Sequence, residues 1–223
     1  TSPALLTFDE AETMFHEFGH SLHGLFANTK YRSLEGTNVP RDFVEMPSQI
    51  MENWFVEPDM LALFAKHYKT GKVIPQELVD KIQKSSKYGQ GFGTVEYLAA
   101  SYLDMDYHIL TEAFKENPMK FEDQKMKELG LIPEIISRYR STYFNHIFTT
   151  GYDAGYYSYI WAEVLDKDAF EKFKEDGIFN RSTAIGFRRI LERGNSEDPM
   201  KMYIEFRGKE PSIVPLLKGR GLM

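Results

Sequence analysis

The feature that most constrains this chain is the pentapeptide His-Glu-Phe-Gly-His at residues 16–20, which lies in a segment with the signals of an α-helix. Thr7 and Glu10 have the spacing of a capping box, in which a hydroxyl and a carboxylate satisfy backbone N–H groups at a helix start. Apolar side chains then recur at helical spacing to about residue 28. We therefore predict an amphipathic helix that carries both histidines.

The two histidines of this pentapeptide are four residues apart, so they project from one face of a helix and both imidazoles can bind one metal ion. His16 and His20 are the predicted ligands. Zinc lowers the pKa of a bound water to about 7. Glu17 is the predicted base that takes a proton from the water as it attacks a carbonyl carbon. Gly19 fits a position where another backbone passes close to the helix.

The general pattern His-Glu-x-x-His, in which x is any residue, also occurs by chance in unrelated helices, but the capped helix and an acidic segment downstream favour a metal site. That segment, residues 42–54, is expected to supply a third ligand. Glu45 is the first candidate, because a carboxylate flanked by apolar residues is costly to bury without a cation. Glu52 is the second candidate. If it does not bind the metal, we expect it to be exposed to solvent or to support one of the ligands by a hydrogen bond. Asp42 is expected to cap the following helix.

His23 shares the face of the two predicted ligands, three residues after His20. Three ligands along one straight helix cannot converge on a tetrahedral ion. We therefore expect His23 to form a hydrogen bond behind the site or to pack in the interior.

Composition narrows both the kind of metal site and the kind of partner. The chain has no cysteine, so any metal must be held by nitrogen and oxygen. Its 33 acidic and 27 basic residues give a formal charge of −6, which argues against general binding to nucleic acid or anionic membranes. No apolar run approaches the roughly 20 residues that cross a bilayer, and no secretory signal is recognisable. Peptides and small molecules are the expected partners, and the cytoplasm is the expected location.

Helical patterns recur through the rest of the chain, and no convincing pair of strands is found, so the expected fold class is mostly α. The predicted helices cover about residues 44–69, 75–87, 94–116, 121–128, 133–139, 156–175 and 182–193. Two glycine-rich segments, 89–93 and 149–155, are predicted loops that hinge or contact a substrate.

Several segments resemble the signature sequences of the zinc peptidases that include thimet oligopeptidase and bacterial peptidyl-dipeptidase, also called dipeptidyl carboxypeptidase. They cover residues 15–20, 36–38, 41–49, 138–144, 146–161 and 193–198. The resemblance spans essentially the whole chain. The amino-acid sequences of residues 36–38 and 41–45 are most similar to those of the peptidyl-dipeptidase branch. Within this resemblance Glu45 falls at the position of the third zinc ligand.

The resemblance also assigns roles in the aromatic segment from Tyr143 to Tyr159. His146, Tyr152 and Tyr159 match positions that bind substrate and stabilise the transition state in this family. Composition alone would make these tyrosines part of an apolar core. A phenol or imidazole donor aimed at a developing oxyanion gives the family assignment a physical basis.

The resemblance further implies that residues 1–223 are the C-terminal catalytic part of a longer, zincin-like metallopeptidase. The small sheet that precedes the metal helix and the opposite channel wall are then expected in an N-terminal part of the same chain. The expected function is zinc-dependent hydrolysis of short peptides with release of C-terminal dipeptides. The alternatives are internal cleavage of oligopeptides and, for this chain by itself, a zinc-binding domain without activity.

Overall fold

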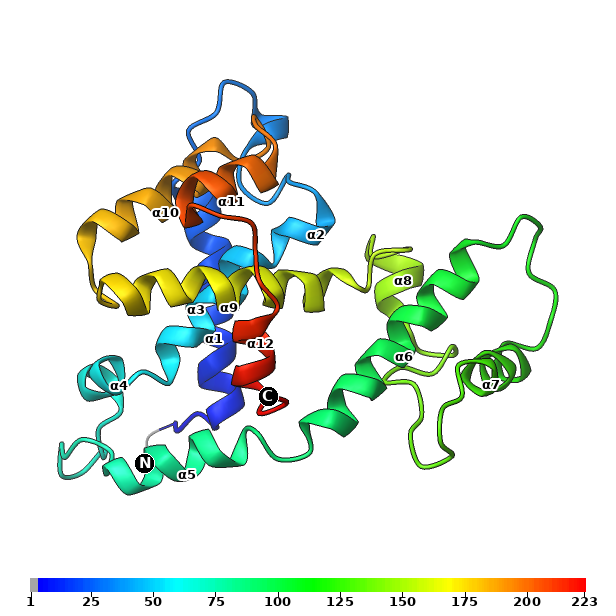
Figure 1. Ribbon diagram of the computed structural model, residues 1–223, viewed down its shortest axis with the longest axis horizontal. Helices are drawn as coiled ribbons and strands as arrows, with labels where there is room; N and C mark the ends of the chain where they lie inside the picture. The colour runs from blue at the N-terminus through cyan, green and yellow to red at the C-terminus, as the bar shows by residue number, and fades with distance from the viewer. Residues whose placement is uncertain (1–3) are drawn as a thin grey trace. The chain divides into compact units, whose positions relative to one another are not determined.

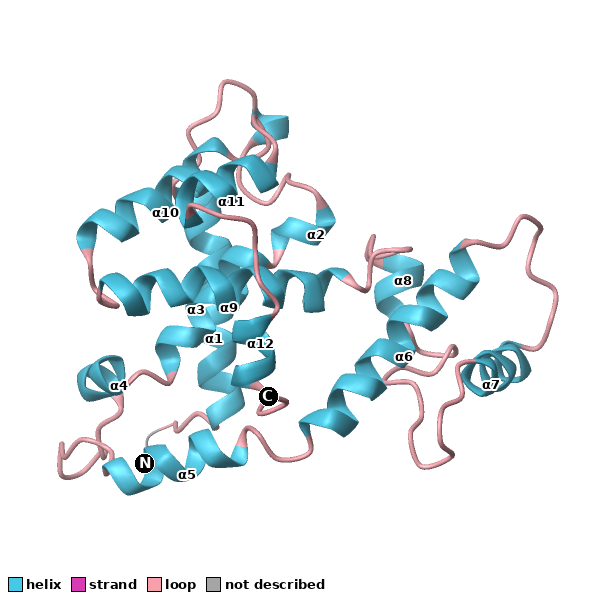
Figure 2. Cartoon of the chain, in the orientation of Figure 1, coloured by secondary structure: helices cyan, strands magenta, loops and turns pink. Residues whose placement is uncertain are grey.

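The computed structural model describes residues 4–223, and helices joined by loops account for nearly all of its regular structure (Figures 1 and 2). Within these residues the strand pattern is limited to one isolated bridge between Lys66 and Val73. The predicted fold class, mostly α, is confirmed.

The helices share a short to medium length, and the longest have 19 residues. They are α1 (Phe8–Leu25), the 3₁₀ helix η1 (Arg32–Leu34), α2 (Arg41–Val44), α3 (Met46–Phe55), α4 (Pro58–Phe64), α5 (Gln76–Ser85), α6 (Gln90–His108), α7 (Pro118–Glu128), α8 (Asn145–Thr149), α9 (Ser158–Asp176), α10 (Arg181–Arg193), α11 (Pro199–Arg207) and α12 (Val214–Gly219).

The chain divides into two compact units. Unit 1 comprises Thr1–Tyr88, Ile160–Gly221 and Met223, and unit 2 comprises Gly89–Tyr159 and Leu222. The pentapeptide and its acidic segment therefore belong to unit 1, whereas the aromatic segment belongs to unit 2.

The core of unit 1 forms where α1 and α3 pack together and where α9, α10 and α11 add aromatic side chains. Trp54 of α3 makes edge contacts with Phe170 and Phe173, with ring centroids 4.6 Å apart in each pair. Other fully buried members of this core are Met46, Ile50, Leu165, Ile190, Leu191, Met202 and Tyr203. Burial of this many large apolar side chains supplies the main stabilisation of α3, the helix that follows Glu45.

Unit 2 has a smaller core between α6 and α7, built on Leu103 and Phe121. A second group of rings lies around Phe144, which stacks on Tyr139 at 5.1 Å and meets Tyr156 edge-on at 4.9 Å. All three rings also contact the ring of His146, one of the predicted substrate-binding residues.

Helix α1 begins as the capping box predicts. The Glu10 amide donates to the Thr7 hydroxyl oxygen at 3.2 Å, and the Thr7 amide donates to the Glu10 carboxylate at 2.8 Å. The helix ends at Leu25, three residues before the predicted end.

Proline breaks the long helix predicted over residues 44–69. Pro58 begins α4, and Glu57 before it has an extended backbone with ψ 133°. A residue that precedes proline is sterically excluded from the helical region, so α3 and α4 are separate.

The predicted loop at residues 89–93 is wrong beyond its first residue. Gly89 has φ +70°, and α6 starts at Gln90 and includes Gly91 and Gly93. The left-handed residue reverses the chain direction just before the helix, and it needs glycine because that conformation is unfavourable with a Cβ.

The helix predicted at residues 133–139 is absent, and the segment forms turns. The Arg138 amide donates to the Glu96 carbonyl of α6 at 3.3 Å, so part of this backbone pairs with another element instead of with itself. The predicted loop at residues 149–155 is confirmed except for Thr149, which is the last residue of α8.

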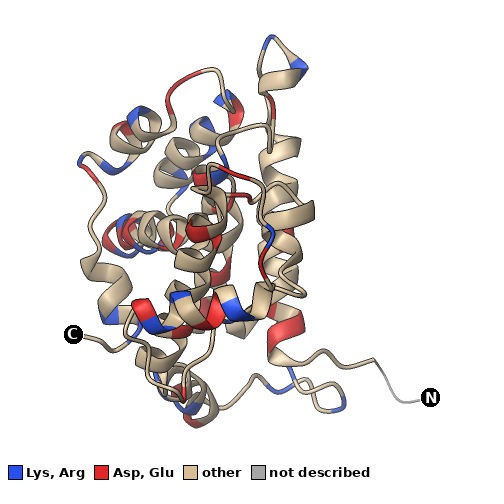
Figure 3. Ribbon diagram, turned by 90° about the vertical axis from the view of Figure 1, so that its right-hand side faces the viewer, with Lys and Arg blue, Asp and Glu red and all other residues tan. Residues whose placement is uncertain are grey.

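Both signs of charge occur on the same helices (Figure 3). Examples are the pairs Lys81 with Glu77 and Arg188 with Glu192, each four residues apart. Among the described helices, none combines the length and apolarity that a membrane crossing requires.

Candidate metal centre

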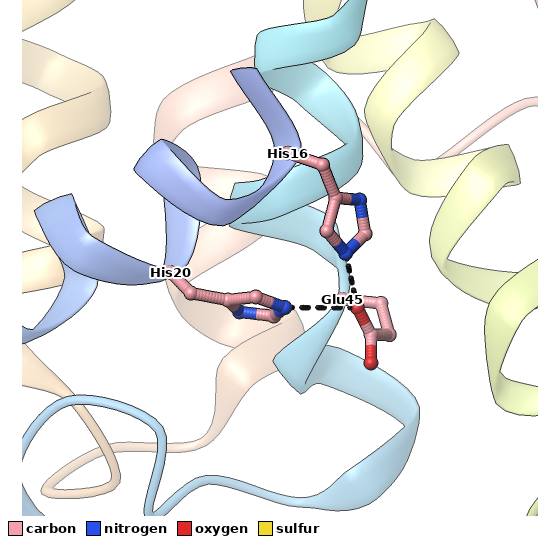
Figure 4. A group of neighbouring side chains, drawn as sticks. All are labelled: His16, His20 and Glu45. Atoms are coloured by element: carbon pink, nitrogen blue, oxygen red, sulfur yellow. Dashed lines mark ion pairs between the residues drawn. The ribbon is translucent and has the colours of Figure 1, made fainter. Parts of the chain in front are cut away.

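His16, His20 and Glu45 point toward one another in unit 1 (Figure 4). Oε2 of Glu45 lies 3.4 Å from Nε2 of His16 and 3.2 Å from Nε2 of His20. One potential ligand atom from each residue lies within 4.8 Å of the other two. The structure therefore brings the two histidines predicted from spacing together with the first-choice carboxylate.

The close packing of α1 on α3 depends on Gly19. A Cβ built at this glycine would lie 2.5 Å from the Cα of Ser48 and closer still to the carbonyl oxygen of Pro47. Since both are backbone atoms of the first turn of α3, neither can move away without shifting that helix. The expected close approach of another backbone is confirmed, and it brings Glu45 within reach of the histidines.

Glu45 occupies the junction between two helices, as the C-cap of α2 and the N-cap of α3. Its side chain is buried, with 4% of the residue exposed. The Ser48 hydroxyl donates to Oε2 of Glu45 at 3.0 Å. A carboxylate with this little exposure is stable only beside hydrogen-bond donors or cations, and the imidazoles of His16 and His20 both lie within ion-pair distance of it.

Glu52 lies behind His16 and sets its tautomer. Oε1 of Glu52 is 2.6 Å from Nδ1 of His16. A carboxylate can only accept at this contact, so Nδ1 carries the proton and Nε2 faces Glu45. The structure thus gives Glu52 the supporting place that was the alternative to ligation, and carboxylate support of this kind is typical of metal-binding histidines.

The two carboxylates also control the charge of His16 in the absence of a metal. Burial acts to lower the pKa of His16, but hydrogen bonds to Glu45 and Glu52 outweigh it and raise the pKa to about 10. The imidazolium is the form that compensates the two carboxylates, and a metal cation placed among the three groups would do the same.

The donor set fits zinc. Bonds of about 2.0–2.2 Å to imidazole nitrogen and carboxylate oxygen, arranged tetrahedrally, put ligand atoms roughly 3.3 Å apart. The two distances to Oε2 of Glu45, 3.2 and 3.4 Å, match this spacing. Two histidines and one glutamate leave a fourth position open, as catalytic zinc sites do.

Glu17 follows His16 on α1 and is exposed. Its carboxylate is not among the three clustered groups. The described geometry therefore leaves it available to solvent, as its predicted role as a base requires.

His23 is fully buried, and neither ring nitrogen has a hydrogen-bond partner. Burial, and then the charge of His20, lower the pKa of His23 to about 4, so its imidazole is neutral. Of the two roles expected for it, packing is the one that the structure supports. Asp42 does not cap a helix, because it lies inside the first turn of α2, whose N-cap is Pro40.

The three residues predicted to bind substrate, His146, Tyr152 and Tyr159, meet in unit 2. His146 comes from α8, Tyr152 from the following loop and Tyr159 from the start of α9. The ring of His146 is 6.2 Å from each tyrosine ring, and the two tyrosine rings stack at 5.1 Å with an interplanar angle of 14°. Residues separated by a glycine-containing loop thus form one cluster.

Ser48 was missed by the sequence analysis, although a signal exists. A serine three residues after a glutamate at a helix start can reach back to its carboxylate, as Ser48 does to Glu45.

Comparisons with known proteins place the chain in one family. The defining pattern of Peptidase family M3 matches residues 1–222. The chain is 47% identical to dipeptidyl carboxypeptidase of Escherichia coli over 225 residues, 40% identical to oligopeptidase A of Salmonella typhimurium over 225 residues, and 35% identical to saccharolysin of Saccharomyces cerevisiae over 226 residues. Each match covers 99% of this chain but only 33%, 33% and 31% of the relative, so the chain spans about a third of the length of these proteins.

Proposed function

Because this chain belongs to Peptidase family M3, we propose that it provides the catalytic zinc centre of a longer metallopeptidase that hydrolyses short peptides. The observation that carries the proposal is the convergence of His16, His20 and Glu45 at distances that suit tetrahedral zinc. In this proposal residues 1–223 are the C-terminal catalytic part, and the other wall of the substrate channel belongs to the remainder of the longer protein.

His16, His20 and Glu45 would hold the ion, and Glu52 would keep Nε2 of His16 free for it. Zinc bound there would supply a Lewis acid that activates water and polarises the scissile carbonyl. The carboxylate of Glu17 takes the proton from the attacking water and returns it to the leaving amine. An exposed carboxylate next to a ligand on α1 suits this role.

The cluster of His146, Tyr152 and Tyr159 would bind the peptide and donate to the oxyanion. The O–H group of a tyrosine stabilises a tetrahedral oxyanion more than the planar carbonyl of the ground state, so the donation lowers the barrier. The proximity of the three rings within unit 2 supports a shared role.

We propose release of C-terminal dipeptides over internal cleavage, because identity is higher to dipeptidyl carboxypeptidase than to oligopeptidase A, 47% against 40%. A digest of one unstructured peptide, analysed by mass spectrometry over time, separates the two. Successive loss of two residues from the carboxyl end supports the first function, and early internal fragments support the second. The proposal includes a cytoplasmic location, which suits a chain without cysteine.

The proposed function is tested by measuring zinc content and peptide hydrolysis on one sample of the longer protein. We expect one zinc per chain and hydrolysis that a chelator abolishes and zinc restores. Hydrolysis that persists in the metal-free protein would contradict the proposal. The same pair of measurements on residues 1–223 alone is expected to show zinc without turnover, since substrate orientation can contribute about 7–11 kcal/mol to lowering a barrier.

A further inference from the structure

A buried carboxylate in unit 2 holds the backbone of the loop that carries Tyr152. Asp104 of α6 is fully buried. Its Oδ1 accepts the amide of Ala154 at 2.9 Å, and its Oδ2 accepts the amide of Tyr156 at 2.8 Å. Both oxygens of one side chain are therefore committed to this short stretch of backbone.

Two further side chains of α6 form hydrogen bonds with Asp104 or with the backbone that it binds. Nδ1 of His108 lies 2.8 Å from Oδ1 of Asp104 and 2.8 Å from its carbonyl oxygen, so Nδ1–H donates toward both acceptors. The hydroxyl of Tyr97 donates to the carbonyl oxygen of Tyr156. Tyr97, Asp104 and His108 are spaced by seven and four residues, which places them on one face of α6.

Residues 154–156, two of whose amides donate to Asp104, include an unusual backbone conformation. Ala154 has φ +51° and is the one residue other than glycine with a positive φ in the described part of the chain. A Cβ makes this conformation unfavourable, so it persists only where other contacts enforce it. The bond from the Ala154 amide to Asp104 is such a contact.

This backbone stretch is connected by further contacts to the two tyrosines proposed to act on the substrate. The Gly155 amide donates to the Tyr152 carbonyl at 2.9 Å, and the Tyr152 amide donates to the His146 carbonyl at 3.1 Å. On the other side, α9 starts at Ser158 and presents Tyr159, whose ring stacks on Tyr152. A change at residues 154–156 would therefore reorient both rings.

We propose that Asp104 is a positioning residue for the reaction: by fixing the Ala154 and Tyr156 amides it holds Tyr152 and Tyr159 in the orientation that the transition state needs. His108 holds the carboxylate, and no contact of Asp104 with the substrate is involved. This inference rests on the proposed function.

The first test is Asp104→Asn in the longer, zinc-loaded protein. An amide has one acceptor oxygen, so the variant loses one of the two backbone bonds and places an N–H group against another N–H group. Small misplacements of catalytic groups can cost about 10²-fold in rate. We expect kcat to fall by about that factor while KM and zinc content stay near the wild-type values.

The matched control is Asp168→Asn. Asp168 is also fully buried, lies in unit 1 and accepts from the Tyr203 hydroxyl at 2.7 Å. It tests whether loss of any buried carboxylate lowers kcat through general destabilisation. A phosphinic peptide that mimics the tetrahedral transition state gives a second readout, since Asp104→Asn should weaken its binding far more than that of a cleaved-product peptide. Equal weakening of both ligands, or an equal fall of kcat in the control, would overturn the inference.

Amide hydrogen exchange tests the inference without relying on activity. In Asp104→Asn the amides of Ala154 and Tyr156 should exchange faster, while those of α7 remain as protected as in the wild type. Unchanged protection at both loop amides would overturn the inference. A wild-type protein that fails to hydrolyse peptides would instead overturn the proposed function, and the exchange measurement would still decide whether Asp104 fixes the loop.

Discussion

The two units place their proposed site residues by different physical means. In unit 1, one face of α1 carries His16 and His20, and the residue just before α3 is Glu45. The glycine contact between α1 and α3 brings these three side chains together. In unit 2, Tyr152 lies in a loop whose backbone is held from a distant helix by Asp104. The positions of side chains on a helix can be inferred from the local sequence. The conformation of a loop that is held by hydrogen bonds from residues remote in the sequence cannot.

The comparison predicts that changes to the proposed ligands and to Glu52 in unit 1 weaken metal binding, whereas changes to Glu17 and to the tyrosines of unit 2 lower turnover without loss of metal. The largest effect is expected for Glu17→Gln, which should lower kcat by up to about 10⁴-fold because an amide cannot accept the proton. Zinc content should be unchanged, since Glu17 is outside the ligand cluster. Kinetics and metal analysis on the same sample check this, and substantial residual activity would remove Glu17 from its role.

Tyr159→Phe should come next, with kcat lower by about 10²- to 10³-fold and KM little changed, because the hydroxyl is proposed to bond to the oxyanion. The ring, and its stacking on Tyr152, would remain. A raised KM with normal kcat would show that Tyr159 binds the ground state instead.

Glu52→Gln should weaken zinc binding by about 10- to 100-fold, because the amide can accept from Nδ1–H of His16 but carries no charge to support the ligand. Glu45→Gln, which alters a proposed ligand, should weaken it further. Competition with a chelator of known affinity measures both constants. If Glu52→Gln had the larger effect, Glu52 and not Glu45 would be the third ligand.

Gly19→Ala should destabilise the protein by about 1–3 kcal/mol, because the new methyl group meets backbone atoms of α3. Gly24→Ala on the same helix is the control, since no atom from another part of the structure lies within 4 Å of its added Cβ. Urea unfolding of the two variants compares them. Equal stability would mean that α1 and α3 are not in close contact at Gly19.

The smallest expected effect is on the pH dependence of stability, and it comes from the buried carboxyl group of Asp166, which accepts a hydrogen bond from Asn53 of α3. Burial raises the pKa of Asp166 to about 7, although Lys167 and a hydrogen bond from Asn53 act to lower it. Because the folded state then binds this proton more tightly than the unfolded chain, stability falls as pH rises from about 4 to 7. The variant Asp166→Asn cannot titrate at this position, so its stability should lack this fall between about pH 4 and 7. Urea midpoints at pH 4, 5.5 and 7 measure the difference between variant and wild type, and parallel pH dependence would contradict the raised pKa.

Local signals account for the parts of the structure that the sequence predicted well. The capping box at Thr7 and Glu10 and the spacing of His16 and His20 depend only on neighbouring residues, and both are reproduced in α1. The apolar flanks of Glu45 indicated a buried acid that needs a cation.

Tertiary contacts explain part of what the sequence analysis missed. The glycines after Gly89 favour a loop, yet they are helical in α6. Asp104 accepts hydrogen bonds from backbone amides about fifty residues later in the sequence, and no local sequence pattern predicts such a bond. The short helix α11 was also missed, although Asp198 before Pro199 is an N-cap signal and accepts from the Lys201 amide at 2.8 Å.

Anomalous diffraction at the zinc absorption edge, from crystals of the zinc-loaded protein, tests the central claim most directly. The account predicts one peak per chain, within about 2.0–2.2 Å of Nε2 of His16, Nε2 of His20 and a carboxylate oxygen of Glu45. A peak bound through Glu52 or His23, or located away from α1, would contradict it.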